Sequence, residues 1–191
     1  LNTLKTEIIK LDTLRNLTIS LIGKFNIDEI KNIFVSTLNI INNDQIYNIE
    51  TIYDLTNLQI LNCPELETIS NLVISKSFII NNCKKLYTIL DVVSPKEITL
   101  VNLPNLLHSN FIFTCIKELT IENCLKLTET FVGTWLTKLT LINTNIISIT
   151  NLSNTTKVHV SNSKCLPDLI LSEISVGAII LKKYFEIRHN S

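Results

Sequence analysis

The segment Leu119-Thr-Ile-Glu-Asn123 decides the fold, because closely similar segments recur along almost the whole chain. Each copy carries apolar residues two positions apart and ends in asparagine; the other copies are Leu38–Asn42, Leu58–Asn62, Phe78–Asn82, Ile98–Asn102, Leu139–Asn143 and Val158–Asn162. The seven asparagines follow one another at spacings of 20, 20, 20, 21, 20 and 19 residues. Such a fixed period is typical of a solenoid, in which each repeat forms one coil and the stacked coils share a core.

Within each copy, apolar and polar residues alternate, as Leu119 and Ile121 do with Thr120 and Glu122. This period of two predicts a strand with one buried face, and the equal spacing of the copies predicts a parallel sheet. Once the apolar residue after each strand is counted, about eight residues remain before the next strand, too few for a stable helix with its connections. The return segments are therefore expected to be extended or 3₁₀.

Weaker copies without the asparagine, Leu17–Leu21 and Ala178–Lys182, extend the series at both ends to about nine coils. Residues 1–191 thus read as one mainly β domain with one long parallel sheet and little α-helix. The composition agrees, since Leu, Ile and Asn supply 83 of the 191 residues and Ala occurs once. The chain begins at Leu1 rather than Met, which favours a fragment of a longer protein.

The pattern Ile116-x-x-Leu119-x-Ile121-x-Asn123-Cys124-x-x-Leu127 resembles a leucine-rich repeat. Cys63, Cys83 and Cys124 stand where that family carries Asn or Cys, which is similar to cysteine-containing repeats and to the repeats of plant-type resistance receptors. The resemblance implies a right-handed solenoid that binds proteins. The coils are shorter than is usual in the family, and the Cys position is also filled by other residues, namely Asn43, Leu103, Thr144 and Ser163.

A structural role is expected for the recurring asparagines, which are Asn42, Asn62, Asn82, Asn102, Asn123, Asn143 and Asn162. Where a coil leaves its strand, a buried amide can satisfy unpaired backbone groups and bond to the amides of the neighbouring coils. The cysteines at the next position, Cys63, Cys83 and Cys124, are expected to be free thiols filling small core spaces. Cys63 and Cys83 lie one coil apart, about 4.8 Å, a separation that a disulfide just spans.

Signals for compartment and partner disagree or are weak. An odd number of cysteines without Cys-x-x-Cys mildly favours the cytoplasm, whereas the sequons at Asn16, Asn151 and Asn154 leave the cell surface open. The net charge of zero gives no reason to expect nucleic acid as a partner. No run of about 18 apolar residues occurs, so no transmembrane segment is expected.

The sequence contains no P-loop, dinucleotide fingerprint, His-Glu-x-x-His or Gly-x-Ser-x-Gly motif. Glu97 and Glu118 are expected to stack on adjacent coils, but Lys138 and Lys157 continue the same column, which indicates a mixed-charge edge rather than a hydrolytic pair. We therefore predict no catalytic residue, no cofactor and no metal site.

The outward positions of the strands are the predicted binding surface: Asn39, Ile41, Gln59, Leu61, Ile79, Thr99, Val101, Thr120, Glu122, Thr140 and His159. They combine short polar groups and aliphatic side chains with few charges, as the centre of a protein interface does. Exposed aliphatic patches also seldom stay uncovered on a monomer. We expect a non-catalytic receptor or scaffold module that binds another protein. Self-association through this face, a parallel β-helix enzyme or lectin acting on polysaccharide, and a spacer or adhesion stalk are the alternatives.

Overall fold

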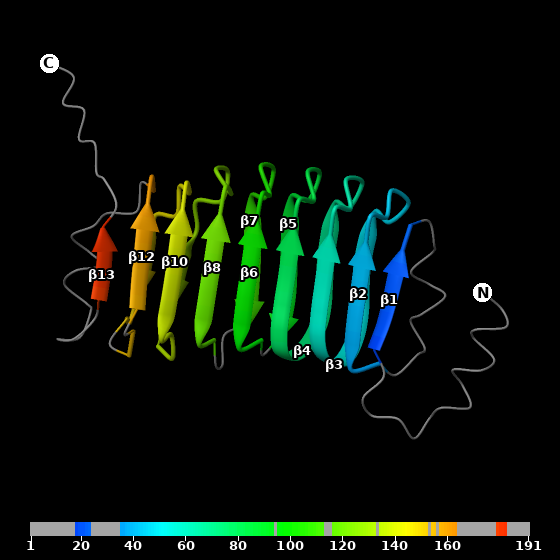
Figure 1. The fold of residues 1–191 in the computed structure, drawn as a ribbon, viewed down its shortest axis with the longest axis horizontal. Helices are drawn as coiled ribbons and strands as arrows, with labels where there is room; N and C mark the ends of the chain where they lie inside the picture. Colours follow the sequence, from blue (N-terminus) through cyan, green and yellow to red (C-terminus); the bar gives the residue numbers. More distant parts are fainter. Residues whose placement is uncertain are drawn as a thin grey trace, which may run out of the picture.

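The fold was analysed in a computed structural model that describes residues 18–23, 35–93, 95–112, 116–132, 134–152, 154–155, 157–163 and 179–182. These residues form strands and turns, and none of them is helical. Figure 1 shows the strands side by side along the long axis of the molecule. The fold is a parallel β-solenoid, and the described residues complete about six of its turns.

The strands in chain order are β1 (Thr18–Ile22), β2 (Thr37–Ile41), β3 (Asn48–Leu61), β4 (Thr68–Asn81), β5 (Thr88–Val93), β6 (Glu97–Val101), β7 (His108–Ile112), β8 (Glu118–Glu122), β9 (Thr130–Val132), β10 (Lys138–Ile142), β11 (Ser148–Thr150), β12 (Lys157–Ser161) and β13 (Ile179–Lys182). We call the order β1-β2-β3-β4-β6-β8-β10-β12-β13 the front sheet; β3 and β4 contribute residues 57–61 and 77–81 to it. All its pairs are parallel, and the seven asparagine-bearing copies are in the register that the repeat predicts, with Leu119 opposite Ile98 and Leu139. The two terminal copies differ from the predicted alignment by two residues, because Ile19 pairs with Leu38 and Ile180 pairs with Val158.

The return segments form a second set of strands, which we call the back strands. The first halves of β3 and β4 pair with each other in parallel, β5 pairs with β4 and β7, and β9 pairs with β11. The extended return path predicted from the sequence is confirmed. Its pairing into a ladder of its own was not predicted, so the description as one long sheet with plain return segments was incomplete.

The core lies between the front sheet and the back strands. Its two inward front columns are Leu38, Leu58, Phe78, Ile98, Leu119, Leu139 and Val158, and Ile40, Ile60, Ile80, Leu100, Ile121 and Leu141, all buried. Phe78 on the front meets Phe111 on the back edge to face, with ring centroids 6.1 Å apart. Burial of each such side chain contributes about 1.5–3 kcal/mol, so stacked repeats stabilise one another although a single coil would not fold.

The ends of the front strands define two edges of the molecule. The upper edge is where the front strands end, and the lower edge is where they begin; the arrows in Figure 1 run from lower to upper. At the upper edge each of the seven repeat asparagines has a positive φ, between 49° and 58°. Asn adopts this left-handed conformation more easily than other side chains, which explains its presence at the corner.

Candidate functional site

The eleven residues predicted as the binding surface lie together on the outer side of the front sheet, and all are half-exposed. One lane runs through Asn39, Gln59, Ile79, Thr99, Thr120, Thr140 and His159, which are direct neighbours in the strand register. The second lane contains Ile41, Leu61, Asn81, Val101, Glu122, Ile142 and Ser161. We call these two lanes the front face.

The front face is more apolar in its N-terminal coils and more polar in its C-terminal coils. Ile41 and Leu61 are adjacent in the second lane, and Ile79 lies next to Gln59 and Thr99 in the first. Near the N-terminal end, the Asn39 amide donates to the Ser20 hydroxyl at 3.1 Å. The face therefore offers aliphatic contact area together with short hydrogen-bonding groups, spaced about 4.8 Å apart from coil to coil.

Charged residues border the front face at its lower end. Glu97 and Glu118 are register neighbours, followed by Lys138 and Lys157, as the sequence predicts. The Lys138 Nζ atom lies 3.0 Å from the Glu118 carboxylate. An exposed pair of this kind contributes only about 0–1 kcal/mol. The two glutamates thus belong to a mixed-charge border, and one of them is engaged by lysine.

The asparagine column forms a ladder, but not a buried one. Amide nitrogens donate to the amide oxygen of the preceding coil from Asn62 to Asn42 at 3.0 Å, Asn82 to Asn62 at 2.8 Å, Asn123 to Asn102 at 2.7 Å and Asn143 to Asn123 at 2.9 Å. Asn102 departs from the pattern and donates to Asn81 at 3.3 Å. The side chains are exposed or half-exposed. The expectation of buried amides was therefore wrong, because the left-handed corner turns the asparagine outward.

Backbone groups at the corner are satisfied by other means. The N–H groups of the first six asparagines each donate to the next coil, for example from Asn42 to the Leu61 carbonyl at 2.9 Å. The following residue points inward, and the fully buried Asn43 donates to the Gly23 carbonyl at 2.6 Å while its Oδ1 accepts the N–H groups of Gln45 and Ile46. The polar capping role expected of the asparagine column is thus played by its inward neighbour in the coil of Asn43.

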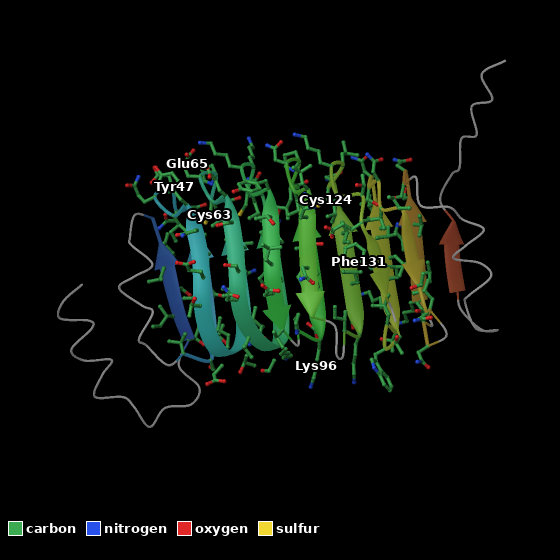
Figure 2. All side chains as sticks on the ribbon, turned by 180° about the vertical axis from the view of Figure 1, so that it is seen from behind. Tyr47, Cys63, Glu65, Lys96, Cys124 and Phe131 are labelled. Atoms are coloured by element: carbon green, nitrogen blue, oxygen red, sulfur yellow. The ribbon has the colours of Figure 1, made fainter. Side chains whose placement is uncertain are left out.

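Cys63, Cys83 and Cys124 occupy this inward position as buried free thiols, as predicted, and Figure 2 shows Cys63 and Cys124 just below the upper edge. Burial raises the pKa of the Cys124 thiol to about 11. The hydrogen bond with Cys63, together with burial, raises the pKa of the Cys83 thiol. The Cys83 and Cys124 thiols are therefore poor nucleophiles, since the thiolate is the reactive form. The hydrogen bond from Cys83 lowers the pKa of the Cys63 thiol. Cys115 and Cys165 lie outside the described residues.

A cluster around Glu129 on the back was not predicted. The Ser109 N–H donates to both carboxylate oxygens of Glu129 at 2.9 Å, and the Ser109 hydroxyl donates to Oε2 at 2.8 Å. His108 Nδ1 lies 3.6 Å from Oε1. His108 and Ser109 both contact the carboxylate, and the Ser109 hydroxyl donates to Glu129 rather than to the His108 imidazole, so this is not the Ser–His pair of an activated serine. In the sequence, the spacing of 20 residues between Ser109 and Glu129 equals one coil, and it could have indicated that the two residues lie next to each other.

This cluster closes a break among the back strands. β7 pairs with β5 and β9 pairs with β11, but no ladder joins β7 to β9 among the described residues. The Glu129 carboxylate accepts hydrogen bonds where backbone carbonyls would otherwise stand. The role that the geometry supports for Glu129 is therefore structural.

Several large apolar side chains away from the front face are also exposed. Tyr47, Tyr87, Leu107, Leu125 and Ile147 lie at or near the upper edge, Leu90 is on a back strand, and Trp135 is in the turn before β10 at the lower edge. Sequence reasoning missed this set, because it assigned only the strand positions to the surface.

Comparison with protein-family models, with curated proteins and with solved structures finds no significant match. In the part of the chain that the structure describes, no group of three or more His, Cys, Asp or Glu side chains is arranged to hold a metal ion. Nor do these residues include a helix of the length and hydropathy needed to span a membrane.

Proposed function

We propose that this chain is a non-catalytic module that binds another protein through the front face. The observation that carries the proposal is the set of half-exposed aliphatic residues on the outer lanes, Ile41, Leu61, Ile79, Val101 and Ile142, on a rigid parallel sheet. The inward positions are uniformly Leu, Ile, Val or Phe, whereas the outward lanes vary from coil to coil. Packing therefore determines which residues stand at the inward positions, but it does not determine which residues stand on the front face.

The dimensions of the front face suit this role. Nine strands at a spacing of about 4.8 Å give a surface roughly 40 Å long. A protein interface of standard size needs about 800 Å² from each partner, with few charges at its centre. The charges of the front face, apart from Glu122, lie at its lower border, which is the distribution expected of an apolar centre with a polar rim.

The test uses two double variants with the same added charge. Leu61→Asp with Val101→Asp places two carboxylates on the front face, whereas Leu90→Asp with Leu107→Asp places them on exposed apolar positions elsewhere. We expect the first variant to lose proteins that the parent chain retains from native lysate, quantified by mass spectrometry, and the second to retain them. Thermal unfolding checks that both variants fold. Equal retention by both variants would contradict the assignment to the front face.

The same surface can also take a second copy of this chain. Sedimentation of the parent chain over a range of concentrations separates that outcome, because a homodimer through the front face dissociates in the Leu61→Asp with Val101→Asp variant. A partner other than this chain leaves the sedimentation of the isolated protein unchanged.

We infer further that the coils are right-handed repeats of the leucine-rich type. The Ile116-x-x-Leu119-x-Ile121 spacing and the Asn-Cys step at the upper edge support this class. An experimental structure with left-handed coils would contradict it.

The back-strand ladder favours one alternative, a parallel β-helix that acts on polysaccharide, because such a fold has parallel strands on more than one side. Its catalytic groups would have to come from Glu97 and Glu118, which are register neighbours. Turnover of polygalacturonate that disappears in Glu97→Gln would support the enzyme. If no polygalacturonate is turned over even at high protein concentration, the enzyme hypothesis is contradicted and the binding module is favoured.

A further inference from the structure

Three successive coils present lysine at the same place on the lower edge. The Lys96 N–H donates to the Lys76 carbonyl at 2.9 Å, and the Lys117 N–H donates to the Lys96 carbonyl at 2.7 Å. The three residues are thus stacked directly, about 4.8 Å apart. All three side chains are exposed, and Figure 2 shows Lys96 at the lower edge of the molecule.

Two more lysines lie in the neighbouring column of the same edge, which also contains Glu97 and Glu118. Lys138 follows Lys117, to whose carbonyl its N–H donates at 3.0 Å, and Lys157 is its register neighbour on β12. Lys138 is engaged by Glu118. Across the described ranges, no carboxylate forms an ion pair with Lys76, Lys96, Lys117 or Lys157. Glu97 and Glu118 lie in the second of these columns, so the two columns together carry five lysines against two glutamates, an excess of positive charge at one edge of a chain whose net charge is zero.

The fold does not require lysine at these positions. Ser36, Thr56 and Thr137 occupy the same column in other coils, where the Thr56 N–H donates to Ser36 and the Thr137 N–H to Lys117. Like charges on neighbouring strands destabilise a sheet. At the upper edge the equivalent cost is avoided, because Lys85 lies against Glu65 of the preceding coil. Stacked lysines without a structural role indicate an anionic ligand.

An exposed aromatic residue lies at the same edge. Trp135 is 60% exposed and stands two residues before Thr137, whose N–H donates to the Lys117 carbonyl at 2.8 Å. Its indole ring has an apolar face and a polar N–H, so it can stack on a ring that also carries polar groups. The exposed Tyr47 lies at the opposite, upper edge (Figure 2), and the exposed Tyr87 is stacked in the same column through the backbone of Glu67.

We propose that the lower edge, formed by Lys76, Lys96, Lys117, Lys157 and Trp135, binds a linear acidic polysaccharide whose sugars carry carboxylates. A polymer with one acid on each sugar matches one amine on each coil, and the indole face packs against a sugar ring. This site is separate from the front face proposed above, so either can exist without the other.

Two other polyanions fit the lower edge less well. Single-stranded nucleic acid is held by successive aromatic residues on which bases stack, and Trp135 is the one exposed aromatic residue of the lower edge among those described. An acidic disordered peptide loses more conformational entropy on binding to a straight row than a stiff sugar chain does.

The chain contains a single tryptophan, so its fluorescence reports directly on the lower edge. Polygalacturonate is titrated into the protein at low salt, with dextran as the neutral control and with oligo-dT and poly-glutamate as competing polyanions. We expect the emission of Trp135 to change with polygalacturonate and not with dextran. Binding should weaken as salt rises, because counterions are released from the polymer.

Two double variants with equal loss of charge locate the site. Lys96→Gln with Lys117→Gln should weaken polygalacturonate binding roughly tenfold and reduce its salt dependence, since two counterion-releasing contacts are removed. Lys84→Gln with Lys126→Gln, at the upper edge, should leave both unchanged. Trp135→Ala, followed by calorimetry, should weaken binding without altering the salt dependence.

Three results would overturn the proposal: no binding of polygalacturonate at low salt, equal weakening by the upper-edge and lower-edge variants, or tighter binding of oligo-dT or poly-glutamate. The last result would assign the edge to nucleic acid or to an acidic peptide instead. Loss of binding by the lower-edge variant alone supports the polysaccharide, whatever the outcome of the protein-capture test on the front face.

Discussion

The front sheet and the back strands are built from the same coils and share one core, yet they differ in regularity. Front segments of four or five residues continue from β1 to β13 in one parallel ladder, whereas back strands range from the three residues of β9 and β11 to the longer first halves of β3 and β4, and no ladder joins β7 to β9 among the described residues. The front corner is asparagine in seven coils and Gly23 in the coil of β1, while the other left-handed positions are held by Thr51, Asp54, Asn71, Asp91 and Asn151. A solenoid thus needs one strictly repeated side to set the register, and the other side can vary.

The largest expected effect tests whether the two sides form one core. Phe78→Ala should lower the free energy of unfolding by about 3–5 kcal/mol, because it leaves a cavity where Phe78 met Phe111. Chemical denaturation of both single variants and the double variant measures their coupling. We expect the double variant to lose less than the sum by about 0.5–1.5 kcal/mol. Simple additivity would show that the front and the back are stabilised independently.

The break in the back ladder is tested next. Glu129→Ala should cost about 2–3 kcal/mol, since it leaves the N–H and hydroxyl of Ser109 without their acceptor. Glu129→Gln keeps one acceptor oxygen and should cost less than half as much. The measurement is equilibrium unfolding of both variants; equal losses would mean that the carboxylate does not bridge the break.

The inward cysteines of the front corner predict a dependence on pH. The pKa of Cys124 is raised to about 11 in the folded chain, so between pH 9 and 11 the thiol ionises in the unfolded state first. In this range the folded state binds more protons than the unfolded state, so the free energy of unfolding decreases as the pH rises. It is unaffected by this thiol below pH 9 and falls by roughly 2 kcal/mol between pH 9 and pH 11. Urea unfolding across this range measures the fall, and Cys124→Ala should make the curve flatter.

The smallest effect compares the two sets of left-handed residues. Asn123→Ala should cost about 1–2 kcal/mol because alanine is strained at a φ of 54°. Asn123→Gly removes this strain but also the amide ladder to Asn102 and Asn143, so any remaining loss belongs to the ladder. At Asn71, on the back, glycine should restore full stability. Thermal unfolding of Asn123→Ala, Asn123→Gly and Asn71→Gly measures these losses, and an equal loss for glycine at both sites would contradict this view.

The solenoid, its register and the front face could be predicted because their signals are local and repeated. Alternation such as Leu119, Thr120, Ile121 and Glu122 fixes which side of a strand is buried, and the constant spacing fixes the neighbour. No partner, compartment or activity follows from that pattern, because the front face is the part that packing leaves free.

The two misjudged features have one physical cause, which is positive φ. In β4 the buried Ile69 and Leu72 are three residues apart, since Asn71 is left-handed between them, so the back strand does not alternate in sequence. At the upper edge the same conformation places Glu122 and Asn123 outward in succession and turns Cys124 inward. A period of two assigns the asparagine to the wrong side.

The break between β7 and β9 has a mechanical consequence. When the two ends of the solenoid are drawn apart, the junctions between β3 and β4, β4 and β5, β5 and β7, and β9 and β11 resist with hydrogen-bonded strands on the back as well as on the front. At the junction of β7 and β9 the back contributes the contacts of one carboxylate, that of Glu129, instead of a ladder. Among these junctions, the one between the coils of β7 and β9 should therefore open first under tension and divide the stack into two shorter rods.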